Sequence, residues 1–145
     1  MIRRVGEAVR HDITYKSRPG AYAILVRNGQ VLLTYQSEPN PEFQLPGGGI
    51  DDGEALLPGL YREVMEETGW RATGFRRLGA FRRFTYLPEY DLWAEKVCQV
   101  YLGRPTIRLG KPTEPEHTAV WTTPEEAIQL VENDGDRMFL IRIFS

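Results

Sequence analysis

The sequence has few of the features that mark a membrane, secreted or nucleic-acid-binding protein. Its 145 residues include a single cysteine, Cys98, which excludes an internal disulfide and fits a reducing compartment. A net charge of −2 does not predict a broad basic surface. No apolar run approaches the ~20 residues of a membrane span, and the N-terminal MIRRVGEAVRHDI has no apolar signal core. We therefore expect one domain over residues 1–145, a cytoplasmic location, and neither a membrane nor a nucleic-acid polymer as partner.

What is present is an alternation of short strands and helices. Residues 22–27 and 30–36 are strand candidates, and Asn28-Gly29 between them favours a type I′ hairpin turn. Residues 1–20 look irregular up to Arg18-Pro19-Gly20, and residues 103–116 look like a loop. Further strands are expected at 43–45, 75–80, 81–87, 92–102 and 120–121, and helices at 123–132 and 137–144.

This order, with strands before and after a central helix, is an α+β pattern in which a mixed sheet carries helices on its faces. Cys98 lies in the alternating apolar run 92–102. We expect its side chain to be a small core group rather than a reactive thiol.

The most distinctive stretch runs from Gly47 to Trp70 and concentrates acidic residues. Its acids are Asp51, Asp52, Glu54, Glu63, Glu66 and Glu67. The last three fall at i, i+3 and i+4, so a helix would project all three carboxylates from one face. The opposite, core-facing stripe is Leu57, Leu60, Val64 and Thr68. Gly69 suits the end of that helix, because glycine adopts the left-handed conformation without penalty.

Clustered carboxylates on a helix can be interpreted in three ways. A solvated acidic face is tolerable, because exposed like charges at i, i+4 cost only about 0.2–0.5 kcal/mol. Oxygen ligands with room for water and phosphates also suit Mg²⁺, and a flexible glycine loop can bring a backbone carbonyl to the same ion. A calcium loop is the third interpretation, but Asp51-Asp52-Gly53-Glu54 lacks the alternating ligands of such loops.

The same stretch resembles the signature of the MutT-like Nudix hydrolases, G-x5-E-x7-R-E-U-x-E-E-x-G-U, where U is a bulky aliphatic residue. Here Gly48 is followed after five residues by Glu54, and after seven more by the run from Arg62 to Trp70. Every fixed position agrees; the one departure is Trp70, aromatic where an aliphatic residue is usual. The resemblance implies the Nudix fold, an α/β/α sandwich. It also implies a Mg²⁺-dependent hydrolase of the diphosphate bond in a nucleoside diphosphate linked to another moiety.

The resemblance assigns roles by position. The positions that resemble ligands of Mg²⁺, or alternatively Mn²⁺, are the Gly47 carbonyl, Glu63, Glu66 and Glu67. The positions with a structural role are Gly48, Glu54, Arg62 and Gly69, of which Glu54 and Arg62 brace the loop against the helix. Family members take the general base from the helix or from a later loop, so Glu63, Glu66, Glu114 and Glu116 all stay open. The catalytic residues implied are Glu63, Glu66, Glu67 and Glu116, the last because it stands five residues before Trp121. His117 is expected to be a solvated loop residue.

Substrate contacts are expected from aromatic and arginine side chains near the motif, which can stack on a base or hold phosphates. These are Tyr35, Phe43, Phe81, Arg82, Arg83 and Tyr86. The lead-in FQLPGGGID resembles the members that hydrolyse nucleoside triphosphates, so a (d)NTP or an oxidised nucleotide ranks first as the small-molecule substrate. Tyr86 lies at a position that the family associates with dinucleoside polyphosphates. Pro88 lies three residues after a position associated with ADP-ribose, so ADP-ribose or a nucleotide sugar is a further alternative. An idle domain that senses nucleotides or binds a partner is a further alternative, and homodimers are frequent in the family.

Overall fold

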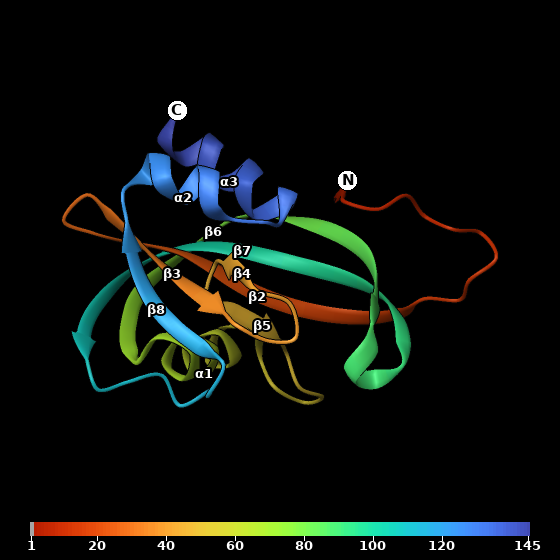
Figure 1. The fold of residues 1–145 in the computed structure, drawn as a ribbon, viewed down its shortest axis with the longest axis horizontal. Helices are drawn as coiled ribbons and strands as arrows, with labels where there is room; N and C mark the ends of the chain where they lie inside the picture. Colours follow the sequence, from red (N-terminus) through yellow and green to blue (C-terminus); the bar gives the residue numbers. More distant parts are fainter. Residues whose placement is uncertain (1) are drawn as a thin grey trace.

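The computed structural model describes residues 2–145 and contains a mixed, eight-stranded sheet flanked by helices (Figure 1). The strands are β1 (Arg3–Val5), β2 (Lys16–Arg27), β3 (Gln30–Gln36), β4 (Glu42–Gln44), β5 (Gly47–Gly49), β6 (Trp70–Leu87), β7 (Leu92–Arg108) and β8 (His117–Thr122). The helices are α1 (Leu56–Thr68), α2 (Pro124–Leu130) and α3 (Asp134–Phe144), with a 3-10 turn η1 (Pro88–Tyr90).

The helices cover both faces of the sheet, α1 on one face and α2 with α3 on the other (Figure 1). Leu60 and Val64 of α1 are fully buried in a core that includes Leu32. Phe139 and Leu140 of α3 belong to a separate core on the opposite side. Burial of these apolar side chains is the main favourable contribution to folding. The arrangement confirms the predicted α+β class and its α/β/α layers.

The sheet runs in the order β1-β6-β7-β2-β3-β4, with β5 paired to β2 and β8 paired to β3. The β5 pairing is antiparallel and aligns Gly47 with Tyr22 and Gly49 with Gly20. The glycine run that was predicted to be a flexible loop is therefore a short strand. Because β5 leads directly toward α1, the sheet fixes where the acidic helix begins.

Strand β2 is longer than predicted, because it begins at Lys16 and includes Arg18-Pro19-Gly20. Parallel pairing with β7 from Lys16 to Leu25 accounts for the difference. The prediction that Arg18-Pro19-Gly20 ends an irregular segment is thus wrong. The predicted turn at Asn28-Gly29 is confirmed, with φ values of 53° and 75° that match a type I′ hairpin.

Two predicted strands at 75–80 and 81–87 form one continuous strand, β6, which pairs antiparallel with β7 along their whole length. Register shifts near Ala72, Arg76 and Gly79 interrupt the regular pairing without ending the strand. Strand β7 continues to Arg108, opposite Trp70, so the loop predicted at 103–116 begins only after that residue. Long-range pairing extends both strands beyond what local sequence indicates.

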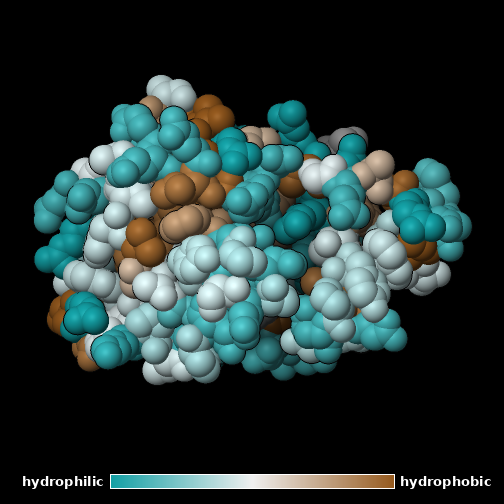
Figure 2. All heavy atoms as spheres, viewed as in Figure 1, coloured by the Kyte–Doolittle hydropathy of each residue, from teal (hydrophilic) through white to brown (hydrophobic). Residues whose placement is uncertain are grey.

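Most of the surface in view is hydrophilic, and hydrophobic atoms gather mainly below α2 and α3 (Figure 2). Within residues 2–145, none of the helices combines the length and the apolar character needed to cross a membrane.

Helix α3 approaches the sheet closely at Gly135. A Cβ atom built at this glycine would lie 2.4 Å from the Phe81 ring, which itself is fully buried. We expect Gly135→Ala to lower the free energy of unfolding by about 1–3 kcal/mol, because overpacking exceeds the gain in helix propensity. Urea denaturation measures the change. Gly110→Ala is the matched control, because a Cβ there meets no atom within 4 Å; equal effects of the two substitutions would contradict the packing argument.

Candidate functional site

Helix α1 carries the three acids predicted to face one side, and the end of that helix is held by glycine. Gly69 has a φ of 76° and donates its backbone N–H to the Met65 carbonyl. A Cβ atom at Gly69 would lie 2.1 Å from the carbonyl oxygen of Gly110, so glycine lets the β7–β8 loop pack on the helix end. In that loop, the backbone N–H groups of Thr113 and Glu114 both donate to the Glu66 carbonyl, at 2.9 and 3.1 Å.

The three carboxylates differ in environment. Glu66 is the most open, with 28% of its side chain exposed, compared with 15% for Glu63 and 9% for Glu67. Burial raises the pKa of Glu67 well above its usual range, although a hydrogen bond from the Gly47 N–H acts in the opposite direction. Burial and the charge of Glu66 also raise the pKa of Glu63. The group is therefore a set of partly desolvated acids rather than a solvated acidic face.

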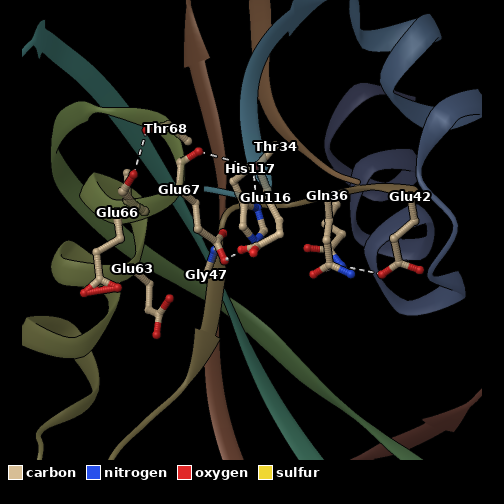
Figure 3. Close-up of polar contacts among 12 residues, drawn as sticks. Thr34, Gln36, Glu42, Gly47, Glu63, Glu66, Glu67, Thr68, Glu116 and His117 are labelled. Carbon is tan, nitrogen blue, oxygen red and sulfur yellow. Dashed lines mark hydrogen bonds and ion pairs between the residues drawn. The ribbon is translucent and has the colours of Figure 1, made fainter. Parts of the chain in front are cut away.

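Glu67 connects the helix with two strands (Figure 3). Its Oε1 accepts from the Gly47 N–H at 3.0 Å, and its Oε2 lies 3.6 Å from Nε2 of His117. On the other side of the imidazole, Nδ1 of His117 lies 2.9 Å from Oγ1 of Thr34. Thr34 in turn donates to the Glu67 carbonyl at 3.2 Å, which closes the chain of contacts.

His117 is not the solvated loop residue that the sequence suggested. It is the first residue of β8, and only 10% of its side chain is exposed. Burial lowers its pKa, so the ring is neutral at pH 7 and its contact with Glu67 is not an ion pair. The strand pairing of Gln36 with His117 places it there, and a short loop sequence did not reveal that pairing.

Arg62 lies between the remaining acids. Its Nε and Nη2 donate to the two carboxylate oxygens of Glu54, at 2.8 and 2.9 Å. Its Nη1 donates to Glu63 at 3.1 Å and to Glu66 at 3.1 Å. Hydrogen bonds from Arg62 and from the Asp51 N–H lower the pKa of Glu54 to about 2. The structure therefore joins the loop residue Glu54 to the helix by a bidentate pair.

Two glycines of β5 leave space that a side chain would fill. A Cβ atom at Gly47 would lie 2.2 Å from the Ala21 carbonyl oxygen, and the φ of Gly47 is 147°. A Cβ atom at Gly48 would lie 2.9 Å from the carboxyl group of Glu63. Glycine at these two positions lets the acidic helix approach the backbone of the sheet.

Of the two loop acids, the structure brings Glu114 rather than Glu116 into contact with the helix acids. Burial, followed by the charge of Glu66 and a hydrogen bond with it, raises the pKa of the Glu114 carboxyl. Glu116 instead lines a neighbouring cavity, and its carbonyl accepts the Ser37 N–H at 2.9 Å.

The carboxylate oxygens of Glu63, Glu66 and Glu67 are the type of ligand that a hard divalent cation prefers. A cation bound among them would also reduce the repulsion between their negative charges. In the conformation described for residues 2–145, no three acidic, histidine or cysteine side chains converge closely enough to hold an ion. The Arg62 guanidinium, which contacts Glu63 and Glu66 at once, holds the positive charge there.

A cavity of about 860 Å³ is lined by residues of β3, β4, β6 and β7 and by Glu116, the residue before His117, and it is polar on two sides. One side carries Gln36, Glu42 and Gln44, which hydrogen-bond to one another across β3 and β4. The other side carries Arg83 and Lys96 of β6 and β7, which pair directly across the strands. Tyr86, which donates a hydrogen bond to Asp91, also lines it.

The predicted substrate residues are distributed unequally. Arg83 and Tyr86 line this cavity. Phe81 does not, because its ring is fully buried against Phe139, and its predicted role as a substrate contact is wrong. The others pack on neighbouring aromatic rings: Tyr35 on Phe43 at 4.9 Å, and Arg82 over Phe84 at 5.7 Å.

Sequence reasoning missed Lys96, Gln36 and Gln44. The sequence contained a sign of the position of Lys96. It lies two residues from both Ala94 and Cys98 in β7, so its side chain is on the same face of the strand as these buried residues. Leu57 was also misplaced: it was predicted to face the core, but it is 38% exposed near the start of α1. Cys98 is buried, and burial raises its pKa to about 11, as expected for a core thiol.

Comparison with known proteins relates this geometry to one family. The NUDIX domain model matches residues 16–141. A Bacillus subtilis (strain 168) protein with the provisional name 8-oxo-dGTP diphosphatase is 32% identical over 74 residues, which cover 51% of this chain and 50% of that protein. A CMP-5'-(N-acetyl-N-hydroxy-3-aminopropyl)phosphonate hydrolase of Streptomyces rubellomurinus is 30% identical over 135 residues, covering 88% of this chain and 62% of the relative.

The similarity therefore spans about half to three-fifths of the length of these curated relatives. Among solved structures, a MutT protein from Bacillus halodurans superposes with a TM-score of 0.70 at 24% identity, over 87% of this chain and 81% of that one. At that identity, the likeness shows the fold alone.

The burial of Glu67 predicts a dependence of stability on pH. Its folded-state pKa is raised, so ionisation of Glu67 destabilises the folded state as pH rises above the usual carboxyl range. We expect Glu67→Gln to increase the free energy of unfolding at pH 8, in a chelator, by about 1–3 kcal/mol. The gain should shrink toward pH 4, where the carboxyl becomes neutral in both states. Urea denaturation measures the change, and Glu132→Gln, at an exposed acid, is the control. A lower stability of Glu67→Gln than of the native protein at pH 8 would contradict this account.

Proposed function

Because the chain belongs to the Nudix hydrolase family, we propose that it hydrolyses a diphosphate bond in a small nucleotide, with a (d)NTP or an oxidised nucleotide as first choice. The observation that carries the proposal is the grouping of three partly desolvated acids on α1. A polar cavity large enough for a nucleotide is lined by Glu116, the residue before His117, which contacts Glu67. Desolvated carboxylates in a cleft are typical of functional sites.

In this proposal, Glu63, Glu66 and Glu67 would hold the divalent ion, together with the carbonyl of Gly47. Mg²⁺ is the expected ion and Mn²⁺ the alternative, since both prefer oxygen ligands. The bound ion supplies positive charge that offsets the anionic diphosphate, and it makes water more acidic.

Arg62 acts as a placeholder in the conformation described. Its Nη1 must release Glu63 and Glu66 for a cation to enter, whereas Nε and Nη2 can keep their two bonds to Glu54. A bidentate pair of this kind fixes the direction of the guanidinium. Glu54 therefore keeps the loop attached to the helix while the opposite edge of the guanidinium gives up its partners.

Among the candidates for the general base, we favour Glu114. Its carboxyl lies against Glu66, and its raised pKa brings it closer to the working pH at which a base is most effective. It sits on the β7–β8 loop, and its own backbone N–H donates to the Glu66 carbonyl at 3.1 Å, which holds it beside the helix acids. Glu63 is the alternative from α1, and Glu116 is assigned to the substrate cavity because it lines that space.

The cavity suggests how a nucleotide would be held. The amides of Gln36 and Gln44 offer donors and acceptors to the edge of a nucleobase, and Glu42 accepts from an amino group. Lys96 and Arg83 on the opposite wall would hold phosphate or ribose oxygens. The name of the Bacillus relative supports an oxidised purine nucleotide, whereas Tyr86 at the cavity wall keeps a dinucleoside polyphosphate as the second candidate.

Hydrolysis itself is the first test. With Mg²⁺ and a panel of canonical and oxidised nucleotides, we expect phosphate or pyrophosphate release from at least one compound. Glu66→Gln should lower that rate by roughly a hundredfold or more, because it removes a ligand charge from the site. Glu125→Gln, at an exposed acid of α2 on the opposite face of the sheet from α1, should keep the native rate. Equal rates for native protein and Glu66→Gln would reject the assignment, and inactivity of the native protein on the whole panel would favour a sensing domain.

The cavity wall gives a second test. We expect Lys96→Met to raise KM by about tenfold and to change kcat much less, because Lys96 contacts the substrate away from the reacting bond. Lys16→Met removes an exposed lysine from the adjacent strand and serves as the control. Steady-state kinetics on the best substrate of the panel measure both. A fall in kcat with unchanged KM would place Lys96 outside the substrate site.

A further inference from the structure

A second cavity, of about 490 Å³, lies at the C-terminal end of α1, beside β8 and the β7–β8 loop. Its wall is formed by the end of α1 with the first residue of β6, the end of β7, the loop that follows, and β8. The side chains that characterise it are Trp70, Arg108, Lys111, Glu114, His117 and Trp121. Its volume falls within the range typical of sites for small organic ligands.

Two tryptophans dominate this cavity. The rings of Trp70 and Trp121 lie 5.4 Å apart at 85°, and both are only partly buried. The same two rings also line a smaller cavity of about 240 Å³ near the β2–β3 turn, where Arg27 lies 5.3 Å from the Trp70 ring. Large aromatic faces left partly open to solvent are a recurrent feature of surfaces that bind planar ligands. Trp70 is also the one position where the chain departs from the aliphatic residue of the signature.

The charge around these rings is mainly positive. Arg108 pairs directly across the strands with Trp70, and Lys111 follows three residues later. Both are exposed, and within residues 2–145 neither forms an ion pair with a carboxylate. Glu114 is the acid on the wall, and it is directed to Glu66. The cavity thus combines aromatic rings with two cations that pair with no carboxylate in the described part of the chain.

We propose that this cavity is a second nucleotide-binding site, which adjoins the site of hydrolysis at Glu114 and His117 but has its own base-binding and phosphate-binding side chains. A nucleobase stacks on the tryptophan pair, and its phosphate is held by Arg108 and Lys111. The site uses neither Glu63 nor Glu67, so it needs no divalent ion. His117 lines the cavity and also contacts Glu67, so a bound nucleotide is one side chain away from the acids of α1.

The test uses the fluorescence of the tryptophans in the full chain, titrated with AMP and GMP in a chelator. Trp93 is first replaced by Phe, so that Trp70 and Trp121 are the remaining reporters. We expect saturable quenching by AMP or GMP, weakening with ionic strength, and none by inorganic phosphate or ribose 5-phosphate, which have no base. Absence of quenching by both nucleotides, or equal quenching by phosphate alone, overturns the proposal.

Charge variants identify the position of the site. In the same background, Arg108→Ala with Lys111→Ala should weaken AMP binding by about fivefold or more, because it removes both phosphate contacts. Arg71→Ala with Arg104→Ala removes two exposed cations from the same strand pair and should leave binding unchanged. Equal binding by the two double variants overturns the assignment. The measurement involves no turnover, so its failure leaves the proposed hydrolysis untouched, and the reverse also holds.

Discussion

The buried carboxylate of Glu67 is the constraint on which the rest of the site depends. A charged group with so little exposure is unfavourable unless its oxygens are hydrogen-bonded or bound to a cation. The Gly47 N–H supplies one bond, and that bond requires β5 to lie against β2 with glycine at the crossing point. Helix α1, strand β5 and strand β8 therefore all meet at the two carboxylate oxygens of Glu67.

This constraint also gives the arginine a defined part. Glu63 and Glu66 share the same guanidinium edge, while Glu54 occupies the other edge with two bonds. Arg62 thus offsets part of the negative charge of the three carboxylates that it contacts, Glu54, Glu63 and Glu66. In the proposed mechanism, a divalent ion would take over the contacts that Nη1 of Arg62 makes with Glu63 and Glu66.

Local sequence specified those parts of the fold that depend on short-range geometry. The spacing of Glu63, Glu66 and Glu67 predicted one helix that carries all three. Asn28-Gly29 predicted the hairpin turn between β2 and β3. Thr123 forms the expected N-terminal cap of α2 with Glu126. The failures share a different cause. His117 is buried because β8 pairs with β3, and the limits of β2, β6 and β7 follow from partners distant in sequence. The family signature located the acids, but it could not show which loop acid touches them or that Phe81 belongs to the core.

The close approach of Gly69 to Gly110 has a consequence for loop grafting. The β7–β8 loop carries Glu114, and it is attached to the helix through the Gly69 and Glu66 carbonyls. A loop transplanted from a relative to alter specificity must bring its own backbone equally close to the helix end, or that end loses its partners. The smallest exchangeable module is thus the helix terminus together with the loop, rather than the loop alone.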